Sequence, residues 1–337
     1  MSQSPLIKLG DIQKNSSNLT FHDFRDYLIL KGILYEENDN IIHITFANDS
    51  FHNHGRIGIN ESVENSVHIN NDDLQESLSG QNEDEKLVEL INLRRKSLSI
   101  SDMKSVDSVL NNLSFTHNLL TNKFNMDITE VRLSCLKPLT WLNDEVINFY
   151  MCLLQQRDDF NTEISCGKKI PSHYFNSFFM TKLMCDKEQR YDYEKVKRWT
   201  KRINIFILDK IFIPVNISNM HWTMIIVYMQ FKEIHYYDSM NGGGVTRFLI
   251  HILQWLKDES NEKYDNRYEI DDNEWQLIDR ESNVPQQNNG CDCGMFSILC
   301  ADFISDNIPL DNSYNQSEIL SYRKKVCAAI LRGELNF

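Results

Sequence analysis

The first 122 residues lack most of what fills a protein core: they contain one of the six prolines, none of the five tryptophans and none of the eight cysteines. Up to about residue 80 the chain is polar and rich in Asn and Ser, although the short piece 40–46 has the composition of a strand. Segments with so little apolar content cannot bury enough surface to offset the entropy of ordering the chain. We therefore expect residues 1–115 to be a low-complexity, mostly disordered extension, with the core downstream.

One segment of this extension has a helical pattern. In 83–98 the acidic residues come first, the basic residues come last, and the apolar residues share one face, which predicts an amphipathic helix. Its end, Arg94-Arg95-Lys96-Ser97, could be a kinase site or a weak nuclear signal. Basic residues are nevertheless common at a helix C-terminus, where they complement the helix dipole.

The sequence also lacks targeting and membrane-spanning segments. No apolar run near its start has the length of a signal peptide, and no stretch approaches a membrane span. The eight cysteines do not have the regular spacing of a disulfide framework. We therefore expect a protein of a reducing compartment, the nucleus (its envelope included) or the cytoplasm, with free thiols and no membrane contact.

Basic residues are too few for a nucleic-acid-binding protein. The formal net charge is −13, of which residues 1–122 contribute 10 basic and 18 acidic residues, or −8, and the remainder −5. This balance disfavours nucleic acid as a partner. An acidic surface suits a protein partner with exposed Lys or Arg, although solubility alone also explains it.

Apolar periodicity predicts the elements downstream of the extension. Helices are expected over 108–120, 144–155, 175–183, 193–198, 246–257 and 321–335. Strands are expected over 206–214 and 276–278, a short strand and turn over 128–136, and a polar loop over 258–273.

The stretch 286–304 carries the strongest signal for chemistry. A polar turn containing Gly290 runs into apolar residues at helical spacing, which places Cys293 in the first turn of a buried helix. Unpaired N–H groups and the helix dipole favour a thiolate there. The side-chain amide of Gln287 could join the backbone N–H of Cys293 in an oxyanion hole. Because a lone cysteine in an apolar helix is more often a core residue, other residues have to support this hypothesis.

Two strands of a predicted hairpin supply that support. Residues 221–229 begin with His221 and are apolar and β-branched, and residues 234–238 form a second strand that ends on Asp238. In an antiparallel hairpin the start of the first strand lies beside the end of the second, so the acid can orient the imidazole. A nucleophile, a base and an orienting acid form the arrangement that acyl transfer requires.

Several motifs together resemble the ubiquitin-like-protein-specific protease family, the sentrin/SUMO proteases. They occur in that family's order, from about Asn125 to the C-terminus: Trp141-Leu142-Asn143-Asp144, Phe175-Asn176-Ser177-Phe178-Phe179, Arg198-Trp199-Thr200, Ile211-Phe212-Ile213-Pro214-Val215-Asn216, His221-Trp222, Tyr236-Tyr237-Asp238-Ser239 and Asn289-Gly290-Cys291-Asp292-Cys293-Gly294.

The resemblance implies an α+β, papain-like cysteine protease domain over 120–337, with a mixed or antiparallel central sheet flanked by helices and with the triad order permuted. It implies that His221 is the base and acid, Asp238 its orienter, Cys293 the nucleophile and Gln287 an oxyanion donor. The family cleaves after the C-terminal Gly-Gly of a ubiquitin-like protein, both in precursors and in isopeptide conjugates. We expect a SUMO-type modifier and its conjugates as the partner, a monomer, no cofactor and no metal.

The resemblance also assigns three substrate-binding residues. Trp141 and Trp222 would close over the final Gly-Gly of the substrate as a narrow tunnel. Asp144, expected to be exposed in the first turn of its helix, would meet an Arg on SUMO.

Other readings of the same residues remain open. Cys291 is a rival nucleophile, although it lies in the turn and not at the helix start. Cys291, Cys293, His221 and His235 could bind zinc, but one Cys-x-Cys without a second spaced pair is weak evidence. The whole protein could instead be a NEDD8-specific protease, a non-catalytic SUMO-binding adaptor or an acyltransferase with the same triad.

Overall fold

The computed structural model describes residues 85–112, 116–184, 190–242, 245–281, 283–311 and 313–335, together with the backbone of three short N-terminal strands. The chain divides into two units, 1–89 and 90–337. In the first unit, strands β1 (Leu6–Lys8), β3 (Ile41–Thr45) and β2 (Leu34–Asn38) pair in that order as an antiparallel sheet. The piece 40–46, whose composition is strand-like, contains β3, and β1 and β2 are two further strands within the extension that was expected to be mostly disordered. The disorder expected for the other residues of 1–80 lies outside the described residues.

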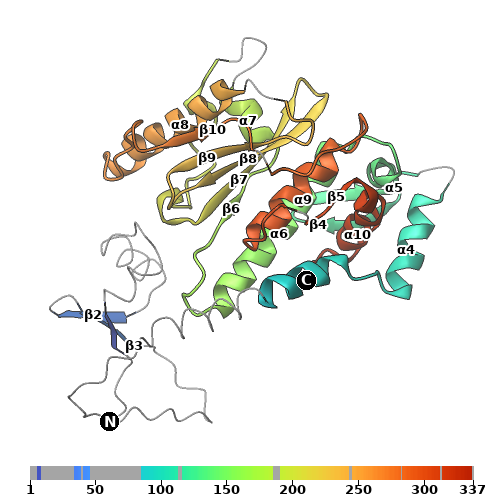
Figure 1. The fold of residues 1–337 in the computed structure, drawn as a ribbon, viewed down its shortest axis with the longest axis horizontal. Helices are drawn as coiled ribbons and strands as arrows, with labels where there is room; N and C mark the ends of the chain where they lie inside the picture. Colours follow the sequence, from blue (N-terminus) through green and yellow to red (C-terminus); the bar gives the residue numbers. More distant parts are fainter. Residues whose placement is uncertain are drawn as a thin grey trace, which may run out of the picture. The chain divides into compact units, whose positions relative to one another are not determined.

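A mixed five-stranded sheet organises the second unit (Figure 1). The strands lie in the order β10 (Gln276–Ile278), β9 (Glu233–Tyr237), β8 (His221–Tyr228), β7 (Lys210–Ile217) and β6 (His173–Tyr174). The three central strands are antiparallel, and each edge strand runs parallel to its neighbour. This sheet confirms the predicted fold class.

Helices cover both faces of the sheet, which explains why its central strands are apolar at nearly every position. One face packs against α7 (Phe178–Leu183) and α8 (Thr246–Tyr264), and Ile213, Ile225 and Trp255 lie in that core. The other face packs against α9 (Cys293–Ser305), and α6 (Asp144–Ile164) lies beside α9. The Ser297 hydroxyl of α9 donates to the Thr223 carbonyl of β8 at 2.9 Å, which ties the helix to the sheet.

A helical lobe adjoins α6 and α9. It contains α4 (Ile100–Leu110), the hairpin of β4 (Leu119–Lys123) and β5 (Met126–Thr129), α5 (Glu130–Leu133) and α10 (Ile319–Arg332). Among the described residues, no helix is both long and apolar enough to cross a membrane.

Several predicted elements differ from the structure. The helix expected over 193–198 is a short 3-10 helix (Tyr193–Lys195), and the strand expected over 206–214 begins at Lys210, after a 3-10 helix (Ile205–Ile207). The helix predicted over 108–120 was wrong: α4 begins at Ile100 because the Ser99 hydroxyl caps it by accepting from the Asp102 N–H at 3.0 Å. Residues 131–136 are helical because Thr129 caps α5 in the same way. The loop predicted to start at residue 258 begins after α8 ends at Tyr264, since buried Glu259 pairs with Lys263 one turn later.

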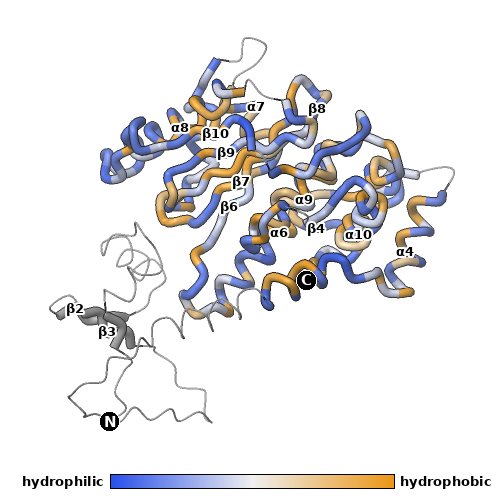
Figure 2. Tube along the Cα trace, in the orientation of Figure 1, coloured by the Kyte–Doolittle hydropathy of each residue, from blue (hydrophilic) through white to orange (hydrophobic). Residues whose placement is uncertain are grey.

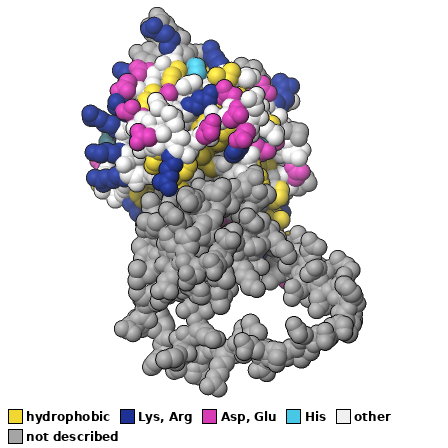
Figure 3. All heavy atoms as spheres, turned by 90° about the vertical axis from the view of Figure 1, so that its left-hand side faces the viewer, with side chains coloured by type: hydrophobic (Ala, Val, Ile, Leu, Met, Phe, Trp, Pro, Cys, Tyr) yellow, Lys and Arg dark blue, Asp and Glu magenta, His cyan; other side chains and the backbone are white. Residues whose placement is uncertain are grey.

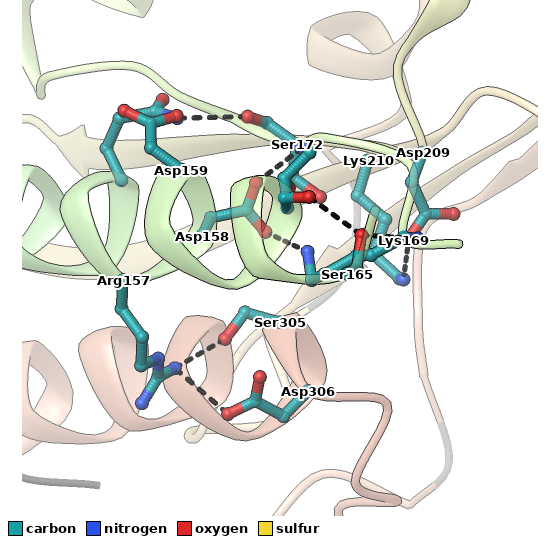
Figure 4. Close-up of polar contacts among 12 residues, drawn as sticks. Arg157, Asp158, Asp159, Ser165, Lys169, Ser172, Asp209, Lys210, Ser305 and Asp306 are labelled. Atoms are coloured by element: carbon teal, nitrogen blue, oxygen red, sulfur yellow. Dashed lines mark hydrogen bonds and ion pairs between the residues drawn. The ribbon is translucent and has the colours of Figure 1, made fainter. Parts of the chain in front are cut away.

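Helix α9 is buried along its whole length and is the most uniformly apolar helix of the unit (Figure 2). Its one acid in the middle, Asp302, is buried and neutralised by two arginines. Arg94, itself 1% exposed, lies 2.8 Å from Asp302, and Arg157 of α6 lies 2.8 Å from the same carboxylate. Figure 4 shows Arg157 reaching Ser305 and Asp306 at the end of α9. A buried network of this kind fixes α9 against α6.

The helix predicted over 83–98 is present over residues 85–95. Its Arg94 is the residue that binds Asp302, and Lys325 of α10 donates to the Arg94 carbonyl at 2.6 Å. The arginine that could have belonged to a kinase motif therefore has a structural role. The domain boundary predicted near residue 115 stays a prediction, but these contacts give a reason to place it before residue 90.

We expect a protein that starts at residue 85 to unfold at the same urea concentration as the full chain. A protein that starts at residue 116 loses Arg94 and the buried apolar side chains of α4, and leaves Asp302 with fewer partners. Removing one partner of a buried ion pair costs about 3 kcal/mol of unfolding free energy. Equal unfolding midpoints for the two truncations would contradict a structural role for residues 85–112.

Candidate active site

Cys293 is the first residue of α9 and its side chain is buried, as the sequence predicted for a helix-start cysteine. The helix begins against Leu142, which immediately precedes the α6 N-cap Asn143. A Cβ atom on Gly294 would lie 2.8 Å from the Leu142 Cβ, so only glycine allows this approach. The contact brings the start of α9 next to the start of α6.

His221 and Asp238 meet at one end of the β8–β9 hairpin, as predicted. The ladder ends at the pair Met224 and Tyr237, and Asp238 follows directly. The His221 Nε2 atom lies 2.7 Å from Asp238 Oδ1, and the Met240 N–H donates to the same oxygen at 2.8 Å. The carboxylate is therefore held from two sides, and it can hold the imidazole in turn.

The charges of this trio favour a thiolate beside an imidazolium. Burial alone lowers the pKa of His221, but the hydrogen bonds and charges of Asp238 and Cys293 outweigh burial and raise that pKa to about 9. Burial alone raises the pKa of Cys293, but His221 and the backbone N–H groups of Trp222 and Gly294 lower it. Since Nε2 of His221 binds Asp238, Nδ1 is the ring nitrogen left for the thiol.

Gln287 lies in the irregular segment between β10 and α9. Its backbone N–H donates to the Ser239 carbonyl at 2.9 Å, and the Ser239 hydroxyl donates to its Oε1 at 2.6 Å. Its Nε2 donates to the Asn289 carbonyl at 2.5 Å. The amide is thus oriented towards the loop that precedes Cys293, and its predicted role as an oxyanion donor stays a prediction.

Hydrogen bonds hold two tryptophans near the start of α9. Trp222 is buried, and its indole N–H donates to the Leu142 carbonyl at 2.9 Å. Trp141 is half exposed, and its indole N–H donates to the Gly290 carbonyl at 2.8 Å. Trp141 therefore covers the turn before the nucleophile and offers an aromatic face to solvent.

Asp144 differs from its prediction as an exposed residue. It is partly buried, and it accepts a hydrogen bond from the Ser177 hydroxyl at 3.3 Å. Burial raises its pKa, and the Ser177 hydrogen bond opposes that rise. The reason for the difference is that the segment before α7 packs over the first turn of α6.

The alternative roles find little support in the geometry. Cys291 lies in the turn, and its thiol contacts the Asn289 side chain at 3.4 Å, while burial and the Asp292 charge raise its pKa. Both ring nitrogens of His235 pair with carboxylates, Glu233 and Glu281, so this histidine is not available to a metal. Within the described residues, no three His, Cys, Asp or Glu side chains gather as a metal site would require.

Sequence reasoning missed two residues that lie behind the nucleophile, Asp292 and Arg323. Arg323 of α10 is 1% exposed, and its guanidinium binds the Asp292 carboxylate at 2.6 Å. The available signal was an arginine on the apolar face of α10, beside Ile319, Tyr322 and Val326. A charged residue at such a position requires a buried partner.

Known proteins are similar to this chain in sequence and in fold. The profile of the Ulp1 protease family, C-terminal catalytic domain, matches residues 140–333, more than half of the chain. Ubiquitin-like-specific protease ESD4 of Arabidopsis thaliana is 37% identical over 213 residues, covering 62% of this chain and 41% of that protein. Human sentrin-specific protease 2 is 36% identical over 219 residues, covering 64% of this chain and 34% of that protein. The chain thus spans less than half the length of these relatives.

A solved structure gives the same result. The C-terminal Ulp1 protease domain in complex with Smt3, the yeast ortholog of SUMO, superposes with a TM-score of 0.56 and 30% identity, covering 71% of this chain and 97% of that one. The chain therefore belongs to the Ulp1 protease family.

Proposed function

We propose that this protein is a cysteine protease that hydrolyses the bond after the C-terminal Gly-Gly of a SUMO-type modifier, in precursors and in conjugates. The observation that carries the proposal is the trio of Cys293 at a helix start, His221 beside it and Asp238 at 2.7 Å from the imidazole. The intact trio favours an enzyme over a binding adaptor. The family relatives named as sentrin-specific or bound to Smt3 favour SUMO over NEDD8.

The reaction follows from the charges of the trio. The Cys293 thiolate attacks the carbonyl carbon of the terminal glycine, and the backbone N–H of Cys293 and the amide of Gln287 stabilise the oxyanion. The His221 imidazolium protonates the leaving amine, which departs and leaves a thioester on Cys293. His221 then takes a proton from water, the resulting hydroxide attacks the thioester, and the thiolate is released as the glycine carboxylate forms.

Substrate recognition involves the residues around the helix start. Trp141 and Trp222 flank the position of the terminal glycines, and a passage lined by indoles admits backbone more readily than side chains. Asp144 would pair with a basic residue of the modifier. On the described part of the face shown in Figure 3, basic and acidic side chains are interspersed and do not form the single-sign basic patch that nucleic-acid binding requires.

The test is labelling with vinyl-sulfone probes of SUMO, NEDD8 and ubiquitin side by side, with the Cys293→Ala variant as the control. We expect labelling by the SUMO probe and none in the control. Preferred labelling by the NEDD8 probe would support the alternative substrate. A SUMO precursor with Ala in place of its penultimate Gly tests the passage, and its efficient cleavage would exclude it.

Trp222→Ala should reduce cleavage much more than Asp144→Ala. The first removes a buried indole and its hydrogen bond to Leu142, which costs about 3 kcal/mol or more of stability and displaces the neighbouring His221. The second removes a charge at the rim of the site, which is worth about 1 kcal/mol and acts through KM. Steady-state kinetics with a SUMO precursor separate the two, and a larger kcat loss in Asp144→Ala would reverse their roles.

A further inference from the structure

Asp292 occupies the N-cap position of α9, yet its side chain does not cap the helix. An aspartate at this position ordinarily accepts hydrogen bonds from the free N–H groups of the first turn. Here both carboxylate oxygens are turned away. Oδ1 accepts from Arg323 at 3.0 and 2.6 Å, and Oδ2 accepts from Asn289 and from Gln316, each at 2.7 Å. The first-turn N–H groups of α9 are therefore left for another acceptor.

The guanidinium that holds Asp292 is itself anchored elsewhere. Arg323 also donates to the carbonyls of Cys135 at 3.0 Å, Lys137 at 3.1 Å and Thr140 at 2.8 Å. These carbonyls belong to the segment that leads to Trp141. Backbone carbonyls fix one side of the planar Arg323 guanidinium. The other side of the guanidinium therefore fixes the position of the Asp292 carboxylate.

We propose that Arg323 is a positioning residue that prevents Asp292 from capping α9 and so reserves the first-turn N–H groups for the Cys293 thiolate and the substrate oxyanion. The oxyanion part rests on the proposed function, whereas the thiolate part stands on the geometry alone. Arg323 also neutralises the carboxylate adjacent in sequence to Cys293. An uncompensated negative charge there would oppose a second negative charge on sulfur.

The titration of Cys293 supports this role. The Gly294 N–H is among the groups that lower the pKa of Cys293, together with His221 and the Trp222 N–H. The other charged or titratable groups nearby are Asp238 behind His221, and Cys291, Asp292 and Arg323 on the side of the turn. A carboxylate released from Arg323 can take the Gly294 N–H and add a like charge. Both changes raise the pKa of the thiol.

The rate of Cys293 alkylation by iodoacetamide as a function of pH measures this effect without any substrate. All proteins carry Cys291→Ala, so that the chymotryptic peptide that ends at Phe296 contains Cys293 as its one thiol and is separated from Cys300 for mass spectrometry. We expect Arg323→Met to move the alkylation profile upward by roughly one pH unit, so that alkylation slows about tenfold at pH values below the pKa of the Cys293 thiol. With a SUMO precursor, kcat should fall while KM changes little.

Two further variants separate positioning from stability. Adding Asp292→Ala to Arg323→Met should return the alkylation profile to that of the Cys291→Ala protein, because no carboxylate remains to cap the helix. Arg94→Met removes another buried arginine, which pairs with Asp302 of α9 far from Cys293, and should lower stability without moving the alkylation profile. If Arg323→Met is insoluble, Arg323→Lys replaces it. We expect a smaller upward shift of the alkylation profile, because a lysine ammonium keeps the charge but cannot bind the carboxylate and the carbonyls with a planar guanidinium.

An alkylation profile of the Arg323 variant equal to that of Arg94→Met would overturn the proposal, and so would a failure of Asp292→Ala to restore the rate. These outcomes differ from a failure of the proposed function. A protein that cleaves no SUMO, NEDD8 or ubiquitin substrate would still show the shift and its rescue if Arg323 positions Asp292.

Discussion

The Cys293→Ala variant will bind a SUMO-type substrate and will not cleave it. The change removes the nucleophile, for which neither His221 nor Gln287 can substitute, so kcat should fall by at least about 10⁵-fold. The sulfur is small and its neighbours are held by the β8–β9 hairpin and by Leu142, so the free energy of unfolding should change by about 1 kcal/mol or less. Cleavage assays with a precursor and with an isopeptide conjugate measure the loss, and calorimetric titration measures the retained binding.

Cys291→Ala is the matched control for this prediction. Its thiol contacts only the local Asn289 side chain, and its pKa is raised and not lowered. This variant should therefore keep most of the activity. An inactive Cys291 variant beside an active Cys293 variant would exchange the two assignments.

Asp238→Asn should lower turnover by at least about 100-fold while the protein stays folded. An asparagine oxygen can still accept from the Met240 N–H and from the imidazole, so the hairpin keeps its shape. The amide carries no charge, so it cannot stabilise the imidazolium. Near wild-type kcat in this variant would remove Asp238 from the trio.

The pH profile gives this second prediction a direction. The thiolate–imidazolium pair exists at pH values above the lowered pKa of Cys293 and below the pKa of His221, which is about 9. Activity should therefore rise as the pH passes the pKa of Cys293 and fall as the pH passes the pKa of His221. Because the pair titrates jointly, both limbs belong to the pair. In Asp238→Asn the pKa of His221 falls and that of Cys293 rises, so the active range should narrow from both sides. A profile of unchanged width would show that the carboxylate charge does not support the pair.

The sequence was sufficient to predict the trio because each member lies at the end of an element with a clear local pattern. Cys293 follows a polar turn and begins an apolar helix, and His221 and Asp238 end the paired strands of one hairpin. The fold class followed from the resemblance that the family motifs carry. Helix boundaries such as the start of α4 were harder to predict. The capping residue Ser99 sets that start, and it lies within a polar stretch that contains other serines.

The buried ion pairs could not be predicted in the same way. Arg94 and Asp302 are 208 residues apart, and Arg323 and Asp292 are 31 apart, so no periodicity joins them. Arginine is also a good helix former, so its presence in a helix does not indicate that it is buried. Only the packing of α9 against its neighbours shows which acids are enclosed and which basic residues must reach them.

The complete burial of α9 has a consequence for how this protein loses activity on heating. Amide protons of a helix enclosed on all sides exchange with solvent only when most of the domain opens. The nucleophile is the first residue of that helix, so its position depends on the same cooperative unit of structure. Thermal inactivation and loss of tertiary structure should therefore coincide as one cooperative transition, and residual activity after a heat pulse counts the molecules that are still folded.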